Sequence, residues 1–208
     1  MHDDRPDLGR REVIQRLAMS VGGLVTFPFI TAAHPVQHHL RDEAAVGVAD
    51  RKSQAPEYTP EFLDAHQFET LQVLAERIVP GSSKAHSSAF IDQLLTVATP
   101  DEQRRFLQAL GGFEQLAMTR ARVAWKQLSE QQQNELLTVA STEKSGTTTE
   151  ARGASSAAHV TVRDHFEHLK GWIVGAYYSS ELGMRELGWT GTVFFPAFAG
   201  CDHSEGHQ

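Results

Sequence analysis

The stretch TPDEQRRFLQALGGFEQLAMTRARV, residues 99–123, decides the fold class of this chain. Thr99 and Glu102 have the spacing of a capping box, and Pro100 between them suits the first position of a helix. Apolar residues then recur at intervals of three and four, which places them on one helical face; they are Phe106, Leu110, Phe113 and Leu116. The pattern predicts a long amphipathic helix that covers a hydrophobic core.

The segments on either side of this helix repeat its periodicity. One helix is predicted to open at Thr59–Glu61 and to end at Pro80–Gly81, and Ser129 with Gln132 begins another. Further helices are predicted from the apolar positions Phe90, Ile91, Leu94, Leu95, Val162, Phe166, Leu169, Ile173 and Tyr177. Strand patterns are nearly absent. The sequence therefore predicts an all-α fold, a single irregular domain of about five to six helices.

Three segments lack a helical pattern. Residues 34–57 are polar and mixed in charge, which predicts a flexible linker. Residues 141–158 are rich in serine, threonine, glycine and alanine, which predicts a surface loop. Residues 181–208 combine glycines with aromatic side chains, which predicts an extended aromatic arm at the end of a domain that spans residues 58–208.

The predicted arm admits two compatible interpretations. It folds back onto the core of its own domain, or it lies across a partner protein, because aromatic residues are enriched at the centre of protein contacts. We favour the partner, with Trp189, Phe194, Phe195, Phe198 and Cys201 at the interface.

Cys201 is the only cysteine of the chain, so an intrachain disulfide is excluded. It is an inert thiol, or it forms a disulfide with the partner, or it belongs with Asp202 and His203 to a metal or nucleophilic site. The odd cysteine favours the bond to a partner over the other two interpretations.

The first 33 residues resemble an export signal. Arg10 and Arg11 stand directly before an uncharged, mildly apolar stretch, residues 17–33, which is typical of the twin-arginine signals of proteins exported in the folded state. Small residues up to Ala33 suit cleavage by signal peptidase after that residue. Two alternatives stay open: an amphipathic helix of a cytosolic protein, or an uncleaved anchor, although 17 residues are few for a span that usually needs about 20.

Composition and motifs limit the chemistry. The net charge of -7 argues against nucleic-acid binding, which needs a basic surface. The sequence has no dinucleotide, phosphate-loop, haem or Cys-x-x-Cys motif. His165 and His168 have the spacing of a metal-binding pair, but a solvated polar helix face is the favoured interpretation. We therefore expect no catalytic, cofactor or metal site in this chain.

The order of several short patterns resembles the gluconate 2-dehydrogenase subunit 3 family. The patterns are Phe68-x-x-Leu71-x-x-Leu74-x-x-x-Ile78-Val79-Pro80, Ala89-Phe90-Ile91-Asp92, Phe106-Leu107-x-x-Leu110, Leu128-Ser129-x-x-Gln132, Leu187-Gly188-Trp189-x-Gly191 and Gly200-Cys201-Asp202-His203. They extend from about residue 60 to the C-terminus, and a twin-arginine leader is also typical of the family. One departure is Gly81–Ser83, where the family often has acidic residues.

The resemblance implies a non-catalytic accessory subunit of a sugar, sugar-acid or polyol dehydrogenase. The large subunit, of the glucose-methanol-choline group, would carry FAD and lack its own export signal. This chain would take the folded flavoprotein through the twin-arginine translocase to the periplasm, where the complex is soluble or held at the membrane. A cytochrome c subunit with haem is a further implied partner. The alternatives are a free-standing exported metal-dependent enzyme, which would use His165 and His168, and a periplasmic binding module.

Overall fold

The computed structural model describes residues 35–144 and 160–189. Over these ranges it consists of eight α-helices and a short 3-10 helix, without strands, and confirms the all-α fold. The elements are α2 (Pro35–Leu40), α3 (Glu43–Ser53), α4 (Ala65–Ile78), α5 (Ser87–Val97), α6 (Pro100–Ala121), η1 (Trp125–Gln127), α7 (Glu130–Thr142), α8 (Val162–Tyr178) and α9 (Glu181–Glu186). None of the described helices is long and apolar enough to cross a membrane.

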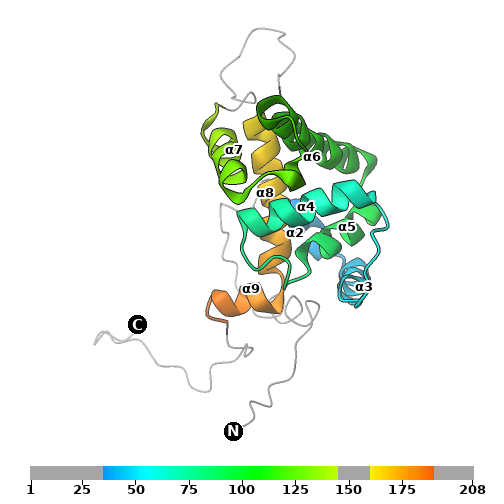
Figure 1. Cartoon of the computed structure of the whole chain (residues 1–208). Coiled ribbons are helices and arrows are strands. Elements are labelled where there is room, and N and C mark those ends of the chain that lie inside the picture. Colours follow the sequence, from blue (N-terminus) through cyan, green and yellow to red (C-terminus); the bar gives the residue numbers. More distant parts are fainter. Residues whose placement is uncertain (1–34, 145–159, 190–208) are drawn as a thin grey trace, which may run out of the picture.

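Helix α8 lies at the centre of the domain. It runs along the middle of the molecule, with α6 and α7 on either side of its first half and α9 at its far end (Figure 1). Helices α2 and α5 also pack on it. Trp172 of α8 is fully buried and meets Phe106 of α6 edge to face, with 5.6 Å between the ring centroids. The hydrophobic core therefore surrounds α8.

The long helix expected at residues 99–123 is confirmed as α6. Thr99 and Glu102 form the predicted capping box, and Pro100 occupies the first turn. The apolar face is buried as expected, with Phe106 and Phe113 fully inaccessible to solvent. The helix beginning at Ser129 is likewise confirmed, with its own capping box.

The prediction that residues 34–57 form a flexible linker is wrong over most of that range, because they include α2 and α3. Val36, Val46 and Ala49 are at most 3% exposed, since α2 packs on α8 and α3 packs on α5. Asp42 caps α3 by accepting the N–H groups of its first turn. The apolar side chains that are buried here are small or short, so the helical pattern is weak, and tertiary packing decides the structure.

The carboxylate of Asp92 in α5 holds the segment before α4. It is fully buried. It accepts hydrogen bonds from the Tyr58 hydroxyl at 2.6 Å and from the backbone N–H groups of Glu61, Phe62 and Leu63 at 2.7, 3.2 and 2.7 Å. One side chain therefore satisfies four donors of a loop that is distant in sequence.

This loop explains why the helix expected to open at Thr59–Glu61 begins later. Helix α4 starts at Ala65, where Asp64 and Gln67 form a capping box. The N–H groups upstream of Asp64 bind the carboxylate of Asp92 and take no part in a helical turn. The prediction of a helix was correct, and its starting residue was wrong.

The segment predicted as an extended arm begins with a helix. Residues 181–186 form α9, which Ser180 caps through its hydroxyl. The remainder of the predicted arm, residues 190–208, lies outside the described residues, as does most of the loop predicted at 141–158, of which 141–144 are described. The helix count exceeds the expected five to six because α2, α3 and α9 all fall in segments where no helix was expected.

Candidate functional site

The chain leaves α9 through a well-defined turn, which we call the arm root (residues 187–189). Gly188 has a φ of 80°, and the N–H of Trp189 donates to the carbonyl oxygen of Met184 at 3.0 Å. The N–H of Gly188 donates to the carbonyl oxygen of Arg185, also at 3.0 Å. These are the bonds of a Schellman motif, whose left-handed residue is usually glycine. The Leu-Gly-Trp pattern therefore sets the direction in which the chain leaves the domain.

Apolar side chains are exposed beside the arm root. Leu182 is 38% and Leu187 is 65% exposed, and Trp189 is half-buried. Apolar surface that remains in water favours burial against another protein. Of the predicted interface residues, Trp189 lies at this place. The other predicted interface residues and the signal residues lie outside the described residues: Phe194, Phe195, Phe198, Cys201, Arg10, Arg11 and Ala33.

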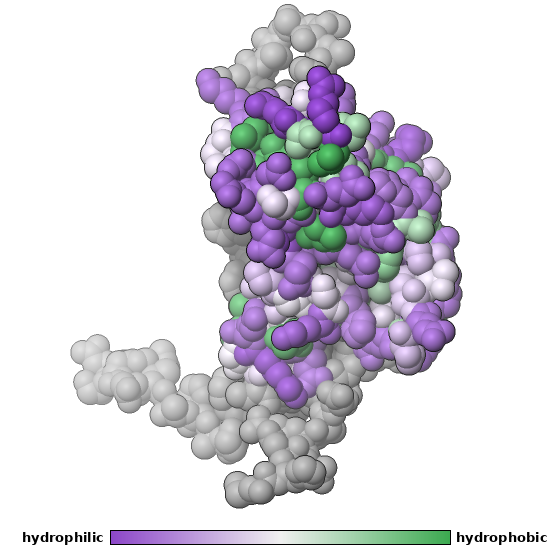
Figure 2. Space-filling view, in the orientation of Figure 1, coloured by the Kyte–Doolittle hydropathy of each residue, from purple (hydrophilic) through white to green (hydrophobic). Residues whose placement is uncertain are grey.

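A second apolar area lies on the face that Figure 2 shows. Most of this face is hydrophilic, and the apolar side chains gather in its upper part, around α6 and α7. Met118 of α6 is 49% and Val139 of α7 is 36% exposed. Neither residue stands out in the sequence, because each is one apolar side chain within a polar helix face.

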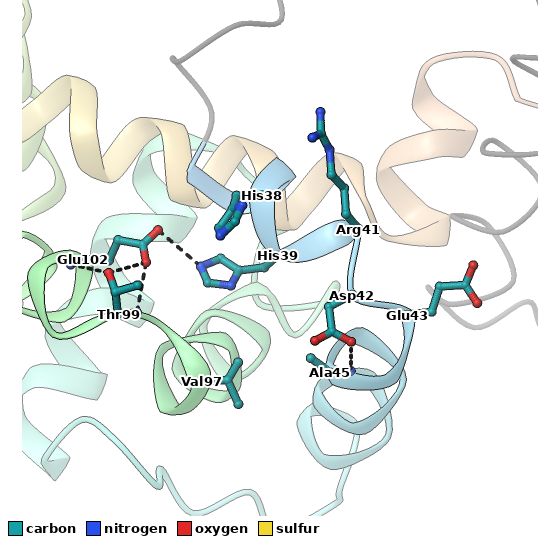
Figure 3. A pocket seen from close by; sticks show the side chains of 9 residues that line it. All are labelled: His38, His39, Arg41, Asp42, Glu43, Ala45, Val97, Thr99 and Glu102. Atoms are coloured by element: carbon teal, nitrogen blue, oxygen red, sulfur yellow. Dashed lines mark hydrogen bonds and ion pairs between the residues drawn. The ribbon is translucent and has the colours of Figure 1, made fainter.

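A hollow of about 740 Å³ opens where α2 and α3 meet the start of α6 (Figure 3). His39 points from α2 toward Glu102 of α6, and 3.6 Å separate its Nε2 from a carboxylate oxygen. The carboxylate of Glu102 also accepts hydrogen bonds from the N–H and the hydroxyl of Thr99, at 3.0 and 2.7 Å. The predicted capping box of α6 therefore forms one wall of this hollow. The full lining is His38, His39, Arg41, Asp42, Glu43, Ala45, Val97, Thr99 and Glu102.

His39 is the least exposed ionisable group of this hollow, at 7%. Its ring lies 5.5 Å from that of Trp172 and 5.3 Å from that of His38, and its Nε2 has no hydrogen-bond partner among the described residues. Burial lowers the pKa of His39; Glu102 and Asp42 oppose that shift, whereas His38 adds to it. The pair of His39 and Glu102 can take up a proton, but burial of the imidazole disfavours the charged form.

His165 and His168 do not form a solvated face, so the favoured interpretation of this pair was wrong. Both are half-buried on the side of α8 that packs against α6. A Cβ placed on Gly112 of α6 would lie 2.4 Å from the His165 ring, which shows how close the helices approach. Burial lowers the pKa of both imidazoles, and the charge of Arg105 adds to the shift at His168. The described part of the chain contains no group of three or more side chains that could hold a metal ion.

Acidification is expected to destabilise the domain through His39 and His168. Folding lowers both pKa values below the ordinary 6.5, so the unfolded chain takes up protons before the folded chain does. The free energy of unfolding should therefore fall as the pH drops below about 6.5. Urea unfolding at several pH values measures this. The double variant His39→Gln, His168→Gln should weaken the dependence near pH 6, and His165, whose pKa burial also lowers, should account for what remains.

The exposed His38 supplies the control for this prediction, because His38→Gln removes an imidazole from the same helix without removing a buried one. This variant should keep most of the pH dependence of the wild type, because burial is the main cause of the His39 shift and His38 only adds to it. A double variant that keeps the wild-type slope would contradict the assignment to the two buried histidines.

Glu76, at the last turn of α4, holds the Gly81–Ser83 loop. Its carboxylate accepts the N–H groups of Gly81 and Ser83 at 2.8 Å each. These bonds lower the pKa of Glu76, the bond from Gly81 most of all, against an opposing effect of burial. Gly81–Ser83 has no acidic residue of its own, and the carboxylate that contacts this loop comes from Glu76 in the preceding helix. Glu76 was not predicted as a functional residue, although a glutamate one turn before Pro80–Gly81 was a usable signal.

The comparisons with known proteins place this chain in a family. A family model described as gluconate 2-dehydrogenase subunit 3 matches residues 65–196. The match begins at α4, runs through the central α8 and the arm root, and leaves α2 and α3 outside. No curated protein and no solved structure matches the chain. Because the family match covers more than half of its residues, the chain belongs to the gluconate 2-dehydrogenase subunit 3 family.

Proposed function

We propose that this chain is the non-catalytic accessory subunit of a heteromeric, FAD-dependent sugar, sugar-acid or polyol dehydrogenase. Family membership over residues 65–196 is the observation that carries the proposal, since the family name describes one subunit of a multi-subunit dehydrogenase. The chain binds the folded large subunit, of the glucose-methanol-choline type, stabilises it and takes it to the periplasm. FAD is held by the large subunit, and a cytochrome c subunit accepts the electrons.

The arm root supports the binding part of this proposal. Leu182 and Leu187 expose apolar surface beside Trp189, an aromatic residue of the kind enriched at the centre of interfaces. The Schellman motif at Gly188 fixes the start of the arm by backbone hydrogen bonds, so less conformational entropy is lost when the arm binds. In this proposal the helices form a rigid platform, and the arm contacts the flavoprotein.

Arg10 and Arg11 support the export part of the proposal, and replacing both residues tests it. The double variant Arg10→Lys, Arg11→Lys is expected to leave both subunits in the cytoplasm, because the translocase reads the two arginines and not merely their charge. Periplasmic dehydrogenase activity with an artificial electron acceptor should fall at least about tenfold relative to wild type, as expected when a receptor-read address is lost. Cell fractionation and immunoblotting of both subunits provide the second measurement.

A second arginine pair offers a matched control. Arg104 and Arg105 stand together in α6, so Arg104→Lys with Arg105→Lys makes the same chemical change within the folded domain. This variant should be exported with its flavoprotein as the wild type is. A flavoprotein that reaches the periplasm equally well with the lysine pair at positions 10 and 11 would overturn the proposed function.

A further inference from the structure

The predicted cleavage site lies next to a packed helix. Cleavage after Ala33 would make His34 the new N-terminus, and α2 begins at Pro35. A single residue therefore separates the bond to be cut from an element of the folded domain.

Helix α2 is fixed to α8 near both of its ends. Val36 is fully buried, and a Cβ placed on Gly175 of α8 would come within 2.8 Å of its Cβ, so the two helices touch closely at this point. Near the other end of α2, His39 is 7% exposed and lies against Trp172 of α8. The residues directly after the cleavage site therefore belong to the hydrophobic core.

Peptidases act on extended and accessible segments, and a packed helix must open locally before it can be cut nearby. The twin-arginine route accepts folded proteins, so α2 is already docked when the chain meets the peptidase. We propose that docked α2 prevents signal peptidase from removing the leader, and that the exported subunit keeps residues 1–33. This inference rests on the proposed export function, and it implies that the apolar residues 17–33 stay attached to the domain and hold it at the membrane.

Purified full-length chain, incubated with purified signal peptidase in detergent, tests the proposal without relying on export. A Gly/Ser spacer of about eight residues between His34 and Pro35 adds a coil of roughly 16 Å while α2 stays docked. We expect the spacer variant to lose residues 1–33 at least about tenfold faster than the wild type, because cleavage then no longer waits for α2 to open. Intact mass spectrometry over time gives both rates.

A second pair of variants tests the role of docking itself. Val36→Asp places a charge in the contact with α8 and should speed cleavage without lengthening the junction. Val48→Asp makes the same change at a position of α3 that is 43% exposed, and it should leave the rate unchanged. The spacer inserted after Lys144, beyond α7, should also leave the rate unchanged.

Equal cleavage rates of the wild type and the spacer variant would overturn the inference, whether both are cut quickly or neither is cut. That outcome would leave the proposed export function intact, because export is measured by the location of the flavoprotein. The opposite failure is distinguishable. If the flavoprotein reaches the periplasm when Arg10 and Arg11 are lysines, the proposed export function is wrong. The ratio of the cleavage rates of the spacer variant and the wild type does not change, because it is measured on purified protein.

Discussion

Replacement of Asp92 by alanine is expected to lower the free energy of unfolding by about 3 to 5 kcal/mol, because four donors, one buried and three partly buried, lose a fully buried acceptor. The carboxylate receives the Tyr58 hydroxyl and the N–H groups of Glu61, Phe62 and Leu63. A methyl group in its place accepts none of them, and the loop before α4 has no other partner for these donors among the described residues. Urea unfolding followed by circular dichroism gives the value.

Two further variants make this result specific. Asp92→Asn keeps one acceptor oxygen and should lie between alanine and wild type. Asp101→Ala removes an exposed carboxylate of α6 that pairs with Arg104, and such a surface pair contributes at most about 1 kcal/mol. In Asp92→Ala, hydrogen exchange should become faster first at the amides of residues 61–63, which lose their acceptor. An alanine variant as stable as the wild type would show that the loop does not depend on this side chain.

Gly183→Ala is expected to displace α9 and with it the arm root. The added Cβ would lie 2.4 Å from the carbonyl oxygen of Tyr177 and 2.8 Å from the Cα of Tyr178. These are backbone atoms at the end of α8, so no side-chain rotation relieves the overlap. Overpacking of this kind costs about 1 to 3 kcal/mol. In the proposed function the arm root must return to its wild-type position to bind, so this cost is taken from the affinity. Since about 1.4 kcal/mol is a factor of ten, the affinity for the flavoprotein subunit should fall about fivefold or more.

Gly111 supplies the matched control. A Cβ there meets no atom within 4 Å, so Gly111→Ala should stabilise α6 by about 0.5 to 1 kcal/mol through helix propensity alone. Titration of the co-expressed large subunit with each variant measures affinity, and hydrogen exchange measures the protection of α9. If Gly183→Ala keeps both the affinity and the protection of the wild type, the arm root does not contribute to binding.

The elements that sequence predicted well are those whose local signals agree with their packing. Helix α6 has a capping box at Thr99, a proline in its first turn and a strong apolar face, and all three features appear in the structure. Helix α7 begins at its expected serine cap for the same reason. Such local signals depend only on residues three or four positions apart, so the sequence displays them directly.

The elements that sequence missed depend on contacts between distant residues. Helices α2 and α3 bury mostly small side chains such as Val36 and Ala49, and only the faces of α5 and α8 make their helical form favourable. The loop before α4 depends on Asp92, about 30 positions further along the chain. His165 occupies a polar position of α8, yet α6 covers it because Gly112 has no side chain there.

The candidate site was predictable to a similar extent. Glycine and aromatic content singled out the stretch that contains Trp189, but its first part, residues 181–186, is a helix, and the arm beyond residue 189 stays a prediction. Glu76, Asp92 and His39 were missed as structural or titratable groups, because their roles arise only when helices distant in sequence meet. Asp92 lies within one of the patterns that indicated the family, but the pattern gave no reason for its presence.

The turn at Gly188 makes the point at which the chain leaves the domain independent of the residues that follow it. Main-chain hydrogen bonds hold the exit, and they do not depend on the identity of the side chains that follow. In the proposed function, sequence changes beyond Trp189 would therefore alter the choice of large subunit, while the chain still leaves the domain at the same place. If that function holds, one helical body would fit different large subunits without any change in its own core.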